Sequence, residues 1–143
     1  MTINDTIQIR IANWLEDGAA LQAVRDIVFI QEQHVPVELE WDGLDADCIH
    51  VLAFSGEKPI GTARLLLNGH IGRMAVLKNW RKKGVGSAML QRLLDEIRNK
   101  GIQYAVLNAQ IGAADFYRRF GFQAEGEEFL DAGIPHVRMV LEV

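Results

Sequence analysis

The sequence is 143 residues long, 49% hydrophobic and 24% charged, and it carries a formal net charge of -4. A chain of this length builds one hydrophobic core, so we expect a single domain over residues 1–143. The negative net charge argues against a general affinity for nucleic acid. No apolar run approaches the roughly 20 residues that cross a bilayer, so we expect no membrane association.

Two further features bear on the compartment and on metal binding. Residues 1–6 lack a cationic segment followed by an apolar run, so no signal peptide is expected. The single cysteine, Cys48, cannot form an internal disulfide, which suits a cytoplasmic location. The four histidines show none of the close pairings of zinc sites, and Cys48 with His50 would supply too few ligands, so we expect no metal.

The first part of the chain predicts a strand followed by a helix. Residues 7–12 alternate apolar and polar side chains, which is typical of a half-buried strand. The helix is expected to begin at Asp17 or Gly18 and to run to about Gln33, because Pro36 disfavours helix in the residue before it. Its apolar face is predicted to carry Leu21, Val24, Ile27 and Val28.

An acidic segment separates this helix from a predicted hairpin. Residues 37–47 are expected to form a loop with a short helical turn. The hairpin that follows consists of a strand, a turn and a second strand, over residues 48–54, 55–59 and 59–67. Asn68 and Gly69 then mark a tight turn, since both residues tolerate positive φ.

The second half of the chain predicts a strand over residues 71–77, a helix ending at Gly101 and a strand over residues 104–108. The last of these is a continuous apolar run, so we expect it to be covered on both faces. Strand, helix and strand in this order imply a parallel pair with a right-handed crossover. A short helix over residues 113–120 and two final strands complete a mixed α/β sheet, the strands lying at residues 122–129 and 136–143.

A basic, glycine-bearing turn joins the central strand to the long helix, and it reads Arg81-Lys82-Lys83-Gly84-Val85-Gly86. The first N–H groups of a helix lack partners inside it and carry partial positive charge. Glycines let an anion approach such amides closely, so the turn suits a phosphate or pyrophosphate. An ordinary turn with solvated lysines explains the same residues equally well. A Walker loop and a dinucleotide fingerprint both match poorly, because Ser87-Ala88 and Met89 stand where their defining residues belong.

The pattern Arg81-x-x-Gly84-x-Gly86, preceded by an apolar strand, resembles the Arg/Gln-x-x-Gly-x-Gly/Ala signature of the GNAT acyltransferase superfamily. A second landmark of that family, A-x-x-F-Y-x-x-x-G-F, is matched by residues 113–122. Together the two signatures and the element order cover nearly the whole chain. The stretches around Trp41 and His136 look like a small stand-alone bacterial subgroup, the ElaA type.

The resemblance implies a GNAT fold, that is, a mostly antiparallel sheet of about seven strands with a splayed central parallel pair and flanking helices. It also implies acetyl-coenzyme A as co-substrate and a small-molecule or peptide amine as acceptor, with a homodimer as a common assembly. By resemblance, the cofactor-binding residues are Met74, Ala75, Val76, Arg81, Lys82, Lys83, Gly84, Val85, Gly86, Ser87, Asn108 and Tyr117.

Acyl transfer to an amine needs an oxyanion donor, an acid for the leaving thiolate and a base for the amine. By resemblance, Tyr117 is the general acid and the Val76 amide the oxyanion donor, although Tyr117 also fits simple core packing and Asn108 could equally be a cap. The family's acidic residue on the central strand is missing here, since Gly72-Arg73-Met74 occupies that place. Glu32 is the tentative base, with Glu40, His136 and a water relay as alternatives. Tentative acceptor-side residues are Gln31, Trp41, Arg73 and His136.

We therefore expect an acetyl-coenzyme A-dependent N-acetyltransferase that acts by direct attack of a primary amine through a tetrahedral intermediate. Two alternatives stay open at this point. One is transfer of a longer acyl group, and the other is a non-catalytic, regulatory acetyl-coenzyme A-binding module. The acidic tract of residues 38–47 hints at a cationic acceptor, although loop acidity commonly serves solubility alone.

Overall fold

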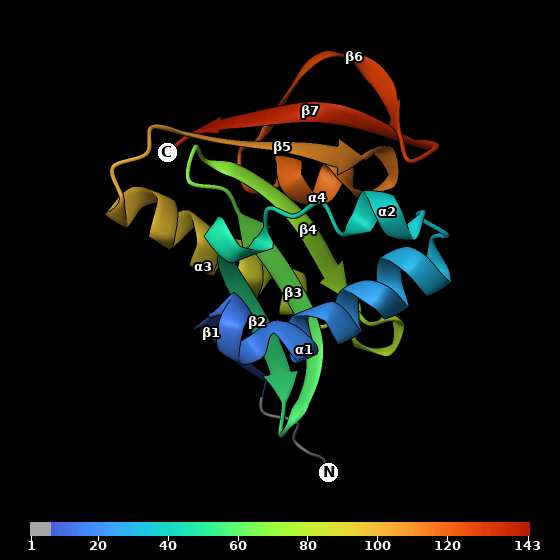
Figure 1. The fold of residues 1–143 in the computed structure, drawn as a ribbon. Coiled ribbons are helices and arrows are strands. Elements are labelled where there is room, and N and C mark those ends of the chain that lie inside the picture. Colours follow the sequence, from blue (N-terminus) through green and yellow to red (C-terminus); the bar gives the residue numbers. More distant parts are fainter. Residues whose placement is uncertain (1–6) are drawn as a thin grey trace.

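A seven-stranded mixed sheet organises residues 7–143, which are the residues that the computed structural model describes (Figure 1). The strand order is β1-β2-β3-β4-β5-β7-β6, and every neighbouring pair is antiparallel except the parallel pair β4–β5. This confirms the predicted fold class; the expectation about residues 1–6 lies outside the described part. The strands are β1 (Ile7–Ala12), β2 (Ile49–Ser55), β3 (Lys58–Leu65), β4 (His70–Val76), β5 (Tyr104–Gln110), β6 (Gln123–Asp131) and β7 (Ile134–Glu142).

Helices cover the two faces of the sheet unequally. Helix α1 packs on β3 and β4, and α3 packs on the opposite face against β1 to β4 (Figure 1). Within residues 7–143, every helix is too short or too polar to cross a lipid bilayer. The helical segments are α1 (Trp14–Arg25), η1 (Asp26–Glu32), α2 (Val37–Glu40), η2 (Asp45–Asp47), η3 (Lys78–Trp80), α3 (Val85–Asn99), η4 (Ile111–Ala113) and α4 (Ala114–Arg118).

Helix α1 begins at Trp14, earlier than the predicted start at Asp17 or Gly18. The side chain of Asn13 accepts hydrogen bonds from the Leu15 and Glu16 amides, so Asn13 is the N-cap. Asp17, which also has the chemistry of a cap, instead accepts a hydrogen bond from the Asn13 amide at 2.9 Å. The prediction was wrong by one turn because two good capping residues lie four positions apart.

The C-terminal part of the predicted first helix is the π-helical segment η1. The Gln33 amide donates to the carbonyl of Val28, five residues earlier, at 3.1 Å. The wider turn changes which residues face the sheet. Ile27, predicted on the apolar face, is 43% exposed, whereas the charged Arg25 is fully buried.

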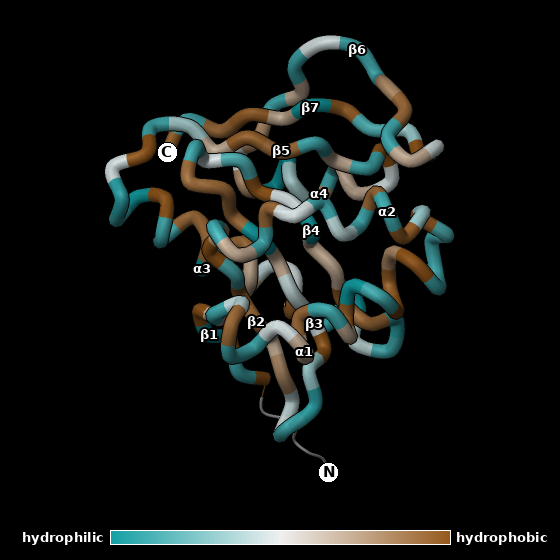
Figure 2. Tube along the Cα trace, in the orientation of Figure 1, coloured by the Kyte–Doolittle hydropathy of each residue, from teal (hydrophilic) through white to brown (hydrophobic). Residues whose placement is uncertain are grey.

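Helix α3 supplies much of the core. Gly84, with φ of +85°, precedes it, and Gly101, with φ of +71°, follows its C-terminus as predicted. Hydrophobic and hydrophilic residues alternate along this helix (Figure 2), and its apolar stripe packs on the sheet. The buried residues of this helix are Val85, Met89, Leu90, Leu93, Leu94 and Ile97.

Strand β5 is buried on one face only, so the prediction of two covered faces was wrong. Ala105, Leu107 and Ala109 are buried, but Tyr104 is 44% exposed and Asn108 is exposed as well. The reason is that α1 lies over β3 and β4 rather than over β5. The uncovered face of β5 borders the candidate site.

Candidate active site

The central feature of the site is the point where β4 and β5 separate. The two strands pair only at His70–Val106 and Ile71–Leu107. Beyond Ile71, β4 contains a bulge at Arg73, which has a positive φ of 52°, and the register with β3 shifts there. The rest of β4 therefore diverges from β5 and presents an unpaired edge.

The end of β4 directs a free amide toward this gap. The Leu77 amide donates to Ile60 of β3 at 2.9 Å. In an antiparallel pair, successive residues point their N–H and C=O groups to opposite sides, so Val76 directs both groups away from β3. The carbonyl of Val76 accepts a hydrogen bond from Arg81 Nε at 2.9 Å, which agrees with this orientation. The Val76 amide thus faces the gap, where a polarised carbonyl could lie.

A cavity of about 280 Å³ opens at the gap. It collects several of the residues singled out in the sequence, from the four elements β4, β5, α4 and β7. Of the predicted site residues, those that line the cavity are Met74, Asn108, Tyr117, Arg73 and His136.

Tyr117 reaches the gap from α4, on the face of the sheet that α3 covers. Its side chain packs with Phe116 and Phe122, and only 9% of the residue is exposed. Burial raises the pKa of its phenol to about 12, so the hydroxyl carries its proton at neutral pH. The hydroxyl donates to Met74 Sδ at 3.4 Å. The structure therefore aims a protonated O–H group at a sulfur atom beside the gap.

The basic turn lies at the N-terminus of α3. No side chain of the described residues caps this helix, and the first helical bond that returns to the turn runs from the Ala88 amide to the Gly84 carbonyl at 3.0 Å. The three preceding amides, of Val85, Gly86 and Ser87, are those that a helix leaves without an internal partner. An anion at this place would meet them directly.

The side chains around this turn differ in their surroundings. Val85 is buried, and a Cβ on Gly86 would lie 3.5 Å from the Phe116 ring, so the turn packs closely on α4. Lys83 Nζ lies 5.3 Å from the centre of the Trp80 ring. Lys82, Lys83 and Ser87 are exposed, which leaves two positive charges near the free amides.

Arg81 is already engaged by protein groups. Its two terminal nitrogens donate to the two oxygens of Glu32, both at 2.7 Å, and its Nε donates to the Val76 carbonyl. The Arg81 hydrogen bond lowers the pKa of the Glu32 carboxyl. Neither a phosphate contact by the Arg81 side chain nor base chemistry by Glu32 is favoured by this arrangement. The pair instead ties η1 to the end of β4.

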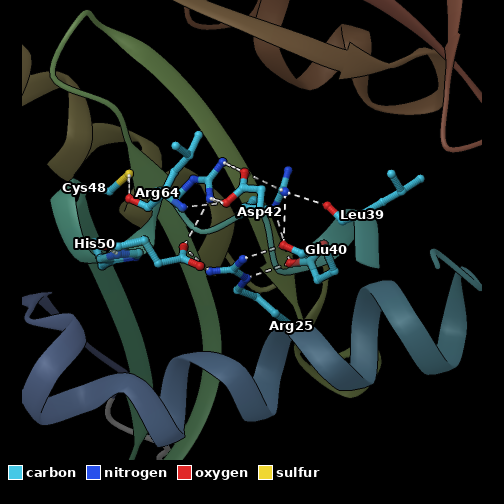
Figure 3. Close-up of polar contacts among 10 residues, drawn as sticks. Arg25, Leu39, Glu40, Asp42, Cys48, His50 and Arg64 are labelled. Atoms are coloured by element: carbon cyan, nitrogen blue, oxygen red, sulfur yellow. Dashed lines mark hydrogen bonds and ion pairs between the residues drawn. The ribbon is translucent and has the colours of Figure 1, made fainter. Parts of the chain in front are cut away.

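Three arginines and three carboxylates form a buried network (Figure 3), and Glu40, Arg64 and Arg73 of this network line the cavity. Arg25 Nε donates to Glu40 Oε2 at 2.7 Å, and Arg25 Nη1 donates to Asp45 Oδ1 at 2.6 Å. Arg64 donates to both oxygens of Asp42 and to Asp45. Burial opposes ionisation of Asp42, but the Arg64 hydrogen bond and charge outweigh it, and the pKa of Asp42 falls to about 2.

Arg73 joins the same network from β4. Its guanidinium donates to the carbonyls of Leu39 and Glu40 and to Asp42 Oδ2, and its Nε lies 3.3 Å from Glu40 Oε2. The charge of Arg73 is thus compensated by protein groups, although the residue lines the cavity, and its role in binding an anionic acceptor stays a prediction. The acidic tract is likewise accounted for in part by internal pairing of Glu40, Asp42 and Asp45.

Sequence reasoning missed this network, although two signals of it were present. Arg25 follows Leu21 by four residues, on the buried face of α1, and Arg64 interrupts the apolar run of β3. A charged residue in such a position needs a buried partner. The acidic tract supplied the partners.

Two tentative acceptor residues lie outside the cavity lining. The Gln31 side chain is exposed and donates to Asp26 Oδ2 at 2.6 Å. The Trp41 ring stacks against the Arg25 guanidinium, whose central carbon lies 4.9 Å from the ring centre. Gln31 thus contacts a residue of its own segment η1, and Trp41 contacts the buried network. Among residues 7–143, no three histidine, cysteine or acidic side chains gather as metal ligands.

A mixed sheet with a splayed parallel pair, a glycine turn before α3 and a tyrosine at the gap defines the acyl-CoA N-acyltransferase class of fold. The family model described as an acetyltransferase (GNAT) domain matches residues 19–143, so the chain belongs to the GNAT acetyltransferase family. This agrees with the resemblance seen in the sequence and supports an acyl-CoA acyltransferase.

Relatives and solved structures agree with this assignment. The uncharacterized N-acetyltransferase YjcF of Bacillus subtilis is 40% identical over 121 residues, covering 82% of this chain and 86% of YjcF. ElaA of Escherichia coli is 31% identical over 132 residues, covering 87% of this chain and 86% of ElaA. The crystal structure of Escherichia coli ElaA superposes with a TM-score of 0.85 at 28% identity, over 94% of this chain and 99% of that one. An acyl-CoA N-acyltransferase from Pseudomonas aeruginosa gives a TM-score of 0.83 at 29% identity, over 94% and 99% of the two chains.

Proposed function

We propose that this protein is an acetyl-CoA-dependent N-acetyltransferase that transfers the acetyl group directly to a primary amine. The observation that carries the proposal is the gap between β4 and β5, which has free helix amides at one end and the Tyr117 hydroxyl beside it. Family membership supports the reaction class, and the unpaired edge of β4 beside Tyr117 supports a thioester in the gap.

The diphosphate of the coenzyme would bind the free amides of Val85, Gly86 and Ser87, with Lys82 and Lys83 as added positive charge. The pantetheine arm would lie along the unpaired edge of β4, where Met74 and Ala75 precede Val76. Asn108, which ends the corresponding part of β5 and lines the cavity, is available to hydrogen-bond this arm.

The chemistry needs stabilisation of an oxyanion and of a leaving thiolate. The Val76 amide would donate to the thioester oxygen as it becomes negative. Tyr117 would act as the general acid for the sulfur. Its pKa of about 12 exceeds the ordinary thiol value of about 8.5, but a thiolate that leaves into the same desolvated pocket is also a stronger base than in water. The Tyr117 contact with Met74 Sδ supports its reach to a sulfur atom at this place.

The test is thiol release from acetyl-CoA in the presence of a panel of primary amines, run beside calorimetric binding of acetyl-CoA. We expect micromolar binding and amine-dependent release. Propionyl-, butyryl- and octanoyl-CoA in the same assay measure the acyl preference; faster turnover with a longer chain would replace acetyl transfer by longer-chain transfer. Binding without turnover for every amine would instead indicate a regulatory module.

A variant separates loop function from folding. Replacing Gly86 by leucine would fill the space beside Phe116 and obstruct the helix amides. Acetyl-CoA binding should be lost in this variant, while the urea midpoint of unfolding shows whether the domain stays folded. Unchanged binding would contradict the assignment of the turn.

A further inference from the structure

His136 is a buried titratable side chain that lines the cavity. It lies on β7, between Gln110 of β5 and Phe129 of β6 in the register of the sheet. The residue is 8% exposed and lines the same cavity as Tyr117. Its ring stacks on that of Phe129, with centroids 5.9 Å apart and planes inclined by 24°.

The protonation of the ring follows from one hydrogen bond. His136 Nδ1 lies 2.6 Å from the carbonyl oxygen of Ile134. Because a carbonyl oxygen can only accept, Nδ1 must carry the hydrogen, and the neutral ring then keeps its lone pair on Nε2. Among the protein groups of residues 7–143, Nε2 has no hydrogen-bond partner. Because Nε2 is also absent from the buried side-chain atoms that lack a partner, it keeps some accessible surface. The free lone pair is thus accessible to a molecule in the cavity.

Three other acid–base groups near the cavity, Glu32, Glu40 and His70, are less suited to accept a proton. The Glu32 carboxylate is held by Arg81, outside the cavity lining. Glu40 is held by Arg25 and lies beside Arg73, within the buried network. His70 belongs to the closed end of the gap, where β4 still pairs with β5. The charged and titratable side chains that share the cavity with His136 are Glu40, Arg64, His70, Arg73, Tyr117 and Asp131.

We infer that His136 is the general base of the acetyl transfer and takes a proton from the acceptor amine through Nε2. The inference rests on the proposed function. A protonated primary amine gives one proton to Nε2, and its nitrogen then attacks the thioester carbon to form the C–N bond. The C–S bond breaks, and the sulfur takes a proton from Tyr117. The nitrogen gives up its second proton, which restores Tyr117 through solvent. His136 releases the first proton to water, so each turnover yields the amide, the thiol and one proton.

The experiment compares His136→Gln and His136→Asn with the unchanged protein in the thiol-release assay. We expect kcat to fall by about 10²- to 10⁴-fold, the range of general-base catalysis, with the calorimetric affinity for acetyl-CoA changed less than about threefold. In the unchanged protein kcat/KM should fall on the acid side of its pH profile, and both variants should lose that limb. Added imidazole should restore part of the rate in the variants.

A matched control is His34→Asn. His34 is exposed, lies outside the cavity lining and has a positive φ of 60°, which asparagine tolerates. Its kcat and pH profile should match those of the unchanged protein. A His136 variant that keeps kcat within about threefold, or keeps the acid limb, would overturn the inference while leaving the proposed function intact. Lack of turnover by the unchanged protein would instead overturn the proposed function.

A second measurement needs no substitution and covers the case in which both variants fail to fold. In the protein labelled with ¹⁵N-histidine, the neutral ring of His136 should show a protonated Nδ1 and an unprotonated Nε2. The opposite tautomer would leave no lone pair for the amine and would overturn the inference.

Discussion

Arg25, the fully buried arginine of the network, offers the most direct test of what stabilises this fold. We expect Arg25→Met to destabilise the protein strongly, because the substitution removes a charge that two buried carboxylates face. Methionine has a similar length and leaves little empty volume. The cost therefore comes from Glu40 and Asp45, which stay buried with fewer partners.

The size of the effect follows from burial. Breaking a buried ion pair by removing one partner costs about 3–5 kcal/mol. Glu40 keeps Arg73 at 3.3 Å and Asp45 keeps Arg64 at 3.2 Å, so the lower end, about 3 kcal/mol, is expected. For a chain of 143 residues, unfolding entropies of about 2.1 cal/mol/K per residue convert this into a Tm lower by about 10 °C.

Urea unfolding and thermal scans of Arg25→Met measure this loss, and Arg10→Met is the matched control. Arg10 donates to both oxygens of Asp17 at 2.8 and 3.0 Å, but its side chain is 47% exposed. Such a pair contributes at most about 1 kcal/mol, so the control should lose no more than about 3 °C. Equal losses in the two variants, or a loss below about 1 kcal/mol for Arg25→Met, would refute the argument from burial.

Three further outcomes are expected. Tyr117→Phe should lower kcat at least tenfold and leave acetyl-CoA affinity within about threefold, as stopped assays and calorimetry can show; unchanged turnover would remove the acid role. Glu32→Arg combined with Arg81→Glu should recover part of the stability and kcat that either single change loses, as a double-mutant cycle measures. Simple additivity would contradict the conclusion that the Arg81–Glu32 pair ties η1 to the end of β4. Asp42 has a pKa of about 2 when folded and about 3.9 when unfolded, so its contribution to stability is complete above pH 4 and is lost as the pH falls toward 2. Asp42→Asn should flatten that part of the pH–stability curve, and an unchanged slope would count against the Arg64 pairing.

Local patterns in the sequence were sufficient for most of the fold. Alternation gave β1 at its observed bounds, and spacing by three and four gave the buried stripe of α3. Local patterns failed where a distant segment decides the environment. The run of β5 reads as buried on both faces, but whether a helix covers it depends on the path of α1, which no residue of β5 encodes.

The position of a site residue could be predicted where it belongs to a sequence motif. Its contacts could not be predicted where two groups compete for the same side chain. Tyr117 and the glycine turn follow from their motifs. The signature placed Arg81 near a phosphate, whereas Glu32, 49 positions away in sequence, competes for its guanidinium. The tautomer of His136 could not be predicted either, because it depends on the position of the Ile134 carbonyl at the start of β7.

The separation of β4 from β5 has a consequence for what this protein can admit. An unpaired strand edge on the outside of a sheet invites other polypeptides to add to it. Here the unpaired edges of β4 and β5 lie within the sheet, and the two strands still pair at His70 and Ile71. A polypeptide strand that entered between them would be stopped where this pairing begins. A narrow chain that carries amide groups could enter the gap and form hydrogen bonds with the unpaired backbone groups. The backbone of the fold thereby selects ligands by their width, before any side-chain contact contributes to specificity.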